Sequence, residues 1–208
     1  MRQLGYLAFS AVVFLVAAWV PIEFLRGKSA LIVLLALLAL VLPFVPGLGV
    51  YRNGAMRWIG LGSRTFQPSE LFKPALVLYL AHLFSKKSDR IGDLMNSTLP
   101  PLLVAVIGTL VIYWQNDFST AIVVLVIAVT MFWIAQVPFR FFIASSTIAF
   151  PLVALSVMTS DFRLKRIITY LRPEYAPESI GYQVLASLKA IRSGGFLGKG
   201  IGLGTVKL

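Results

Sequence analysis

The sequence predicts an all-α fold, a polytopic bundle of about six transmembrane helices that continues into a basic amphipathic tail. Hydrophobic residues make up 58% of the 208 residues and charged residues only 13%, whereas a soluble domain is about half apolar and about a quarter charged. The apolar residues gather in runs near the length of about 20 residues that a bilayer span requires. We therefore expect residues 1–160 to form the membrane bundle and residues 161–208 to begin a large loop outside it.

Six apolar segments account for the predicted spans. The first has too long an apolar run for a signal peptide, so we expect it to be a retained helix. The apolar stretch 99–137 is interrupted only by Gln115-Asn116-Asp117, which predicts a tight hairpin with Asp117 at its turn, because a charge at mid-bilayer would cost several kcal/mol. The predicted helices are residues 4–22, 30–45, 70–84, 99–114, 120–137 and 141–158.

The segments between and after these helices are polar or basic. Residues 26–29 are expected to form a short turn, and residues 47–69, rich in Gly, Arg and Trp, a long loop. The tail is mixed and basic, and part of it suits an amphipathic helix lying on the membrane surface. The apolar residues at helical spacing in this part are Tyr182, Leu185, Leu188 and Ile191.

The distribution of charge predicts the orientation of the helices in the membrane and the kind of partner that the protein binds. The short basic clusters at 26–28 and 86–90 are predicted to lie in the cytoplasm, because positive charge close to helix ends favours that side. The formal net charge is +11. In a membrane protein this favours membrane lipids or a phosphorylated substrate as partners, and no nucleic acid. The chain has no cysteine, which excludes disulfides and thiolate metal sites.

Arg57 and Arg64 are candidates for binding an anion. Their guanidinium groups match the oxygens of a diphosphate, although both could instead extend toward lipid headgroups. Asp117 could bind a metal, accept a proton or hydrogen-bond a sugar, or it could only bond its own backbone at the turn. His82, the only histidine, is expected to be structural. The sequence contains no catalytic triad, P-loop or zinc-ligand spacing.

Glu70 and Lys73 fall at or inside a predicted span. They are three residues apart and therefore share a helix face. Ionisable groups in spanning segments are costly and usually face a bundle interior or a cavity. We therefore expect them to line a functional cavity, while the alternative is that they only pair with each other.

Five motifs together resemble the SEDS family (shape, elongation, division and sporulation), which includes FtsW, RodA and SpoVE. One departure concerns the hairpin motif, where the family usually has QPDxGT. Pro and Gly are replaced at positions 116 and 119, which is expected to loosen the turn. The matching stretches are NGAMRWIGLG (53–62), FQPSELFK (66–73), LYLAHLFSKK (78–87), QNDFSTA (115–121) and GYQVLASLKAIRSGGFLGKGIGLGTVKL (181–208).

The resemblance implies a multi-pass protein of the bacterial inner membrane with about ten helices. Such proteins polymerise lipid II into glycan strands beside a class B penicillin-binding protein that cross-links them. A lipid II flippase and a non-enzymatic scaffold for the penicillin-binding protein are the alternatives. The resemblance also implies that this chain is a fragment, without the family's first helix and its last three.

The implied site binds lipid II and releases undecaprenyl diphosphate. No resident cofactor is implied, although a divalent cation could share with Arg or Lys the stabilisation of the diphosphate. The catalytic aspartate of the family has no counterpart before Leu208 and is expected beyond it. The substrate-binding residues implied by the motifs are Arg57, Glu70, Lys73, Asp117, Thr120 and Gln183.

Overall fold

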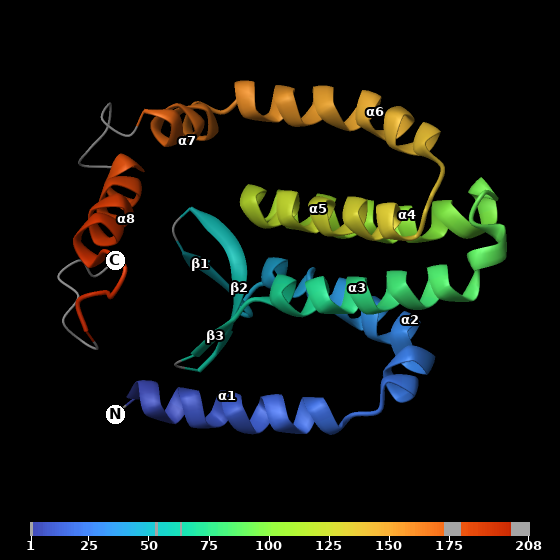
Figure 1. Cartoon of the computed structure of the whole chain (residues 1–208), viewed down its shortest axis with the longest axis horizontal. Helices are drawn as coiled ribbons and strands as arrows, with labels where there is room; N and C mark the ends of the chain where they lie inside the picture. Colours follow the sequence, from blue (N-terminus) through green and yellow to red (C-terminus); the bar gives the residue numbers. More distant parts are fainter. Residues whose placement is uncertain (1, 53, 63, 173–179, 201–208) are drawn as a thin grey trace. The chain divides into compact units, whose positions relative to one another are not determined.

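The computed structural model of the chain describes residues 2–52, 54–62, 64–172 and 180–200. Contacts divide the chain into two compact units, Met1–Phe141 and Phe142–Leu208, and each is described by itself. Helices dominate both units (Figure 1), which confirms the predicted helical character of the chain. The last part of the tail motif, residues 201–208, lies outside the described residues.

All six predicted apolar segments are helical. The hairpin prediction is also confirmed, since α4 ends and α5 begins on either side of residues 115–117. The helices are α1 (Arg2–Trp19), α2 (Ile22–Ala39), α3 (Pro68–Lys86), α4 (Leu99–Trp114), α5 (Phe118–Ile134) and α6 (Phe139–Met158), with short helices η1 (Leu42–Phe44), η2 (Ser88–Arg90) and η3 (Leu94–Thr98) between them.

The predicted turn at residues 26–29 is wrong, because these residues lie inside α2. The break between the first two helices falls earlier, at Pro21, which lacks the backbone N–H that a continuous helix would need. Arg26 and Lys28 have straight side chains that favour helix. The polarity of residues 26–29 suggested a turn, but these residues continue the helix.

The predicted loop at residues 47–69 instead forms a three-stranded antiparallel sheet, so the strictly all-α class is wrong for this segment. The turns are formed with Gly54 at φ 77° and Gly62 at φ 62°, backbone angles that glycine adopts without strain. The sequence pair Asn53-Gly54 is a hairpin signal that could have revealed the first turn. The strands, in the order β1-β2-β3, are β1 (Gly49–Arg52), β2 (Ala55–Leu61) and β3 (Arg64–Phe66).

Three helical segments among the described residues are long and apolar enough to cross a membrane: Ile22–Phe44, Met95–Trp114 and Phe139–Met158. The apolar helices Leu4–Trp19 and Phe118–Ile134 are shorter. The last of the six predicted spans, α3, carries ionisable residues at both of its ends. The chain is therefore a helical membrane protein, and the number of six spans stays a prediction.

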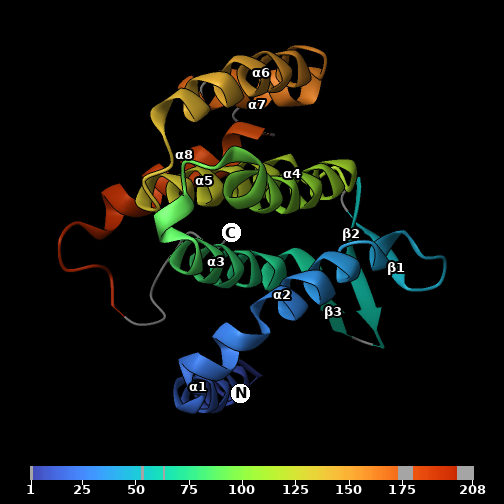
Figure 2. The same cartoon turned by 90° about the vertical axis from the view of Figure 1, so that its right-hand side faces the viewer.

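The core of the first unit is built around α3, which packs against α2, α4 and α5 (Figure 2). Phe72, Leu76 and Leu80 are fully buried on one face of α3. Their contact with α4 is close, because a Cβ added at Gly108 would lie 2.2 Å from Cζ of Phe72. Near the other end of α3, the rings of Phe84 and Phe132 meet edge to face with centroids 5.0 Å apart.

The second unit contains most of α6 together with α7 (Asp161–Leu171) and α8 (Ile180–Gly194). The corner between α6 and α7 is fixed by Arg163, whose Nη1 donates to the carbonyl oxygen of Ser156 at 2.9 Å. The predicted amphipathic helix is found as α8. Its apolar residues Tyr182, Leu188 and Ile191 are exposed, whereas Ala186 is buried. Its place on a membrane surface stays a prediction.

The contact between α3 and α4 predicts that Gly108→Ala destabilises the protein. The added methyl group collides with the buried Phe72 ring, and such overpacking typically costs about 1–3 kcal/mol. Gly27→Ala is a matched control, because Gly27 is also helical and a Cβ there meets nothing within 4 Å. Thermal unfolding of the purified protein in detergent should show a lower midpoint for Gly108→Ala only. Equal midpoints would contradict the close packing.

Candidate functional site

The site is built on the turn between α4 and α5. Asp117 is the N-cap residue of α5, and its Oδ1 accepts a hydrogen bond from the backbone N–H of Thr120 at 3.4 Å. Asn116 takes φ 60°, a left-handed conformation that asparagine tolerates better than most residues. Asn116 and the aspartate cap thus form the turn without the Pro and Gly of the family motif, and the expected loosening stays a prediction.

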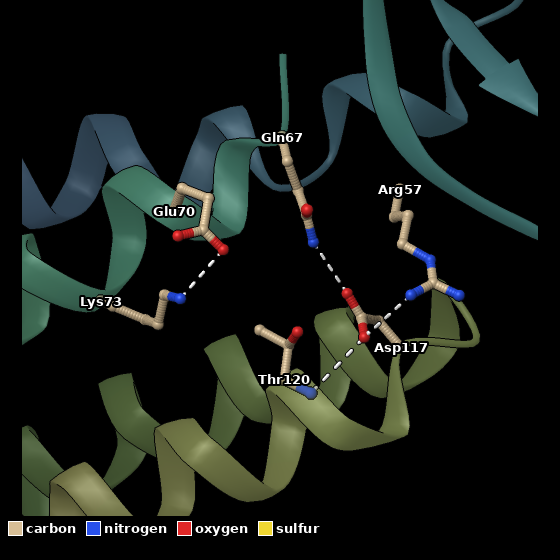
Figure 3. Close-up of polar contacts among 6 residues, drawn as sticks. All are labelled: Arg57, Gln67, Glu70, Lys73, Asp117 and Thr120. Carbon is tan, nitrogen blue, oxygen red and sulfur yellow. Dashed lines mark hydrogen bonds and ion pairs between the residues drawn. The ribbon is translucent and has the colours of Figure 1, made fainter. Parts of the chain in front are cut away.

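The carboxylate of Asp117 is buried and bound by side chains from two other segments. Arg57 Nη1 lies 3.2 Å from Oδ1, and Gln67 Nε2 donates to Oδ2 at 2.8 Å (Figure 3). Asp117 is only 3% exposed and Arg57 29% exposed. A buried carboxylate is tolerated when an opposite charge and further hydrogen bonds satisfy it. We call Arg57, Gln67, Asp117 and Thr120 the Asp117 cluster.

Three elements position this cluster. Arg57 belongs to β2, Gln67 is the residue directly before α3, and Asp117 precedes α5. Gln67 is the contact that sequence reasoning did not single out. Its place immediately before a helix-starting proline marks it as a cap position, but only the fold shows that its side chain reaches across to α5 and not back to its own helix.

Glu70 and Lys73 form an ion pair on the first turns of α3, with Lys73 Nζ 2.9 Å from Glu70 Oε1. The alternative that they pair with each other is therefore realised. Glu70 is 57% exposed and Lys73 25% exposed, so the pair adds little to stability, about 0–1 kcal/mol. Figure 3 shows that both side chains and that of Thr120 lie between α3 and the start of α5.

The roles of Gln183 and Arg64 stay predictions. Gln183 lies on α8, in the second unit. The side chain of Arg64 lies outside the described residues, although its backbone belongs to β3. Among the residues that the structure describes, no group of three or more His, Cys, Asp and Glu could hold a metal ion.

A second buried glutamine fixes the helix ends beside the cluster. Gln115 is fully buried at the end of α4, and its Nε2 donates to the carbonyl oxygen of Leu40, which follows α2, at 2.6 Å. Such a contact satisfies one of the carbonyl groups that the end of a helix leaves without an intrahelical partner. The C-terminal end of α2 is thus tied to the turn that carries Asp117.

The opposite end of the same helices is basic. Arg26 on α2 donates from Nε to His82 Nδ1 at 3.4 Å and from Nη2 to Ser85 Oγ at 3.0 Å, both on α3. The structural role of His82 stays a prediction. The contacts also place the basic residues of 26–28 and 86–90 at the same end of the α2–α3 pair, far along both helices from the Asp117 cluster.

The apolar helices and the charged hairpin turn define a helical membrane protein. The model of the cell cycle protein family of FtsW, RodA and SpoVE matches residues 1–208. The chain belongs to this family, which is the SEDS family that its motifs resemble.

Relatives of known name agree with this assignment. The chain is 36% identical over 207 residues to the probable peptidoglycan glycosyltransferase FtsW of Trichlorobacter lovleyi, covering 100% of this chain and 54% of the relative. It is 33% identical over 177 residues to the stage V sporulation protein E of Bacillus subtilis, covering 85% of this chain and 48% of the relative. The chain thus spans about half the length of these relatives.

Two solved structures share the fold at 27% sequence identity. One is a chain of a peptidoglycan synthase complex that coordinates polymerization and crosslinking, with a TM-score of 0.73 over 94% of this chain and 57% of that chain. The other is the rod shape determining protein RodA of Thermus thermophilus, with a TM-score of 0.61 over 75% of this chain and 49% of that chain.

The burial of Asp117 predicts a large effect of its removal on stability. Asp117→Ala leaves the partly buried Arg57 and Gln67 without their acceptor and removes the cap of α5, and the loss of such a cap alone costs about 1 kcal/mol. Glu70→Ala removes an equally close but exposed ion pair, and should change stability by less than about 1 kcal/mol. Thermal unfolding in detergent measures both variants. A midpoint for Asp117→Ala as high as that of Glu70→Ala would show that the cluster does not stabilise the fold.

Proposed function

We propose that the protein is a peptidoglycan glycosyltransferase of the bacterial inner membrane, which joins lipid II units into glycan strands for cell division or cell-shape maintenance. The match of residues 1–208 to the family model carries this proposal. Relatives named as peptidoglycan glycosyltransferases support it. Residues 1–208 then supply part of the lipid II site, at the end of the bundle where the Asp117 cluster lies.

The reaction sets two requirements for the site. The 4-hydroxyl of one lipid II attacks the anomeric carbon of the growing strand, a C–O bond forms, and the bond to undecaprenyl diphosphate breaks. A base must take the hydroxyl proton. Asp117 is poorly suited to this, because its two oxygens already accept bonds from Arg57, Gln67 and Thr120. The proposed base is therefore a carboxylate other than Asp117.

The second requirement is positive charge at the departing diphosphate. Lys73 is a candidate because its side chain lies between α3 and α5 while remaining partly exposed. Arg57 uses Nη1 to bind Asp117 and is still 29% exposed, so its outer edge remains open to an anion. Glu70 holds Lys73 in place, and Thr120 offers a hydrogen bond to the disaccharide. A divalent cation could add to this charge.

A class B penicillin-binding protein is the proposed partner. The likeness to a chain of a synthase complex that couples polymerization to crosslinking supports it. A flippase would use the same charged residues to move lipid II across the bilayer, and a scaffold would not need them at all. Polymerisation of lipid II in detergent, where there is no bilayer to cross, separates the glycosyltransferase from both.

The proposed role of Lys73 can be tested in the full-length protein together with its partner. Lys73→Met removes the charge that faces the diphosphate and should lower the rate of lipid II polymerisation by about 10²-fold or more. Lys86→Met removes a lysine from the last turn of the same helix, at the end away from the site, and should keep the normal rate. Gel analysis of glycan strands gives both rates. Equal activity of the two variants would reject the role of Lys73.

The proposed orientation places β1 outside the cell and the end of α3 in the cytoplasm. Because the chain has no cysteine, Tyr51→Cys and Lys86→Cys each create a single labelling site, and both positions are exposed. A membrane-impermeant maleimide added to spheroplasts should label the Tyr51→Cys protein at once and the Lys86→Cys protein only after permeabilisation. The reverse pattern would contradict the orientation.

A further inference from the structure

The hydrogen bond between Gln67 and Asp117 joins the starts of two helices directly. Gln67 caps α3 and Asp117 caps α5, and their side chains meet at 2.8 Å although they are 50 residues apart in sequence. Each cap stands three residues before a proposed substrate residue, Glu70 on α3 and Thr120 on α5. Residues three apart lie on one side of a helical turn, so the bond ties the two substrate-facing turns to each other.

This bond sets the distance between the start of α3 and the start of α5. Among the described residues, no other side-chain hydrogen bond joins these two helix starts. The Glu70–Lys73 pair lies within α3, and the Thr120 backbone bond lies within the start of α5. Arg57 ties Asp117 to β2 and not to α3. Asp117 is 3% exposed and the bond is part-buried, so the lower local dielectric strengthens it.

We propose that Gln67 is a positioning residue for the polymerisation reaction. By holding Asp117, it sets the distance between the first turn of α3, with Glu70 and Lys73, and the first turn of α5, with Thr120. Gln67 itself does not touch the substrate in this proposal. The inference rests on the proposed function, because it gives Gln67 a role in a site whose substrate is lipid II.

Gln67→Glu is the sharpest single test. It places a second carboxylate against the Asp117 oxygen that now lies 2.8 Å away, and the repulsion should push α3 and α5 apart. We expect kcat for lipid II polymerisation to fall by about 10–100-fold with little change in KM. Gln67→Ala, which removes the bond without adding charge, should show a smaller loss of kcat. Gln136→Glu, at the end of α5 away from the cluster, controls for an added carboxylate and should keep normal kinetics.

The double variant Gln67→Glu with Asp117→Asn restores every contact with donor and acceptor exchanged. The new amide at 117 donates to the new carboxylate at 67, while its oxygen still accepts from Arg57 and from the Thr120 backbone. Net charge is unchanged. We expect the double variant to recover kcat to within about threefold of wild type, a rescue that requires direct contact between the two side chains.

Spin labels give a readout that does not depend on activity. In the cysteine-free chain, Leu71→Cys and Ile122→Cys place labels on α3 and α5 at exposed positions outside the cluster. Electron paramagnetic resonance should show a broader distance distribution in Gln67→Glu and the original one in the double variant. Unchanged distances together with normal kcat in Gln67→Glu would overturn the proposal. Restored distances without restored kcat would also overturn it, because Asp117 would then act on the substrate itself.

The two proposals fail in different ways. A wild-type protein that does not polymerise lipid II would refute the proposed function. The spin-label distances would then be the remaining test of the spacing between α3 and α5. Changed distances in Gln67→Glu would support the role of Gln67 in that spacing, and unchanged distances would refute it.

Discussion

The structure of the first unit depends on one buried carboxylate. Asp117 stands at the turn of an apolar helical hairpin and is almost fully buried, so its charge is costly unless donors surround it. Those donors come from β2, from the residue before α3 and from the backbone of α5. Satisfying a single charge therefore fixes the sheet, α3 and the hairpin relative to one another.

In the rest of the first unit, polar contacts and apolar packing act at different places along the helices. Polar side chains connect helices at their ends, with Gln115 holding the end of α2 and Arg26 holding the end of α3. Between these ends apolar side chains pack the helices together, most closely where Gly108 accommodates the ring of Phe72. Directional bonds thus set the register of the helices, and shape complementarity fills the apolar middle, where an unpaired polar group would cost most.

Much of this could be predicted from local sequence. Apolar runs identified the helices, and the position of Asp117 in a polar interruption identified the hairpin turn. Helical spacing placed Glu70 and Lys73 on one face, and their pairing was the alternative that it left open. The local sequence pattern did not predict contacts between residues that are distant in sequence. Gln67 has its role only because Asp117 lies beside it in the fold, and Arg26 remains helical while contacting a residue 59 positions away.

The burial of the charged residues separates their roles. Asp117 accepts three hydrogen bonds inside the fold and is only 3% exposed, so in the proposed site it acts through the groups it holds. Glu70 is exposed and Lys73 partly exposed, and among the described residues they pair with each other, so an arriving anion can compete for the lysine. A site for a diphosphate lipid needs both kinds of residue, because exposed charges bind the ligand only if buried ones keep them at the right spacing.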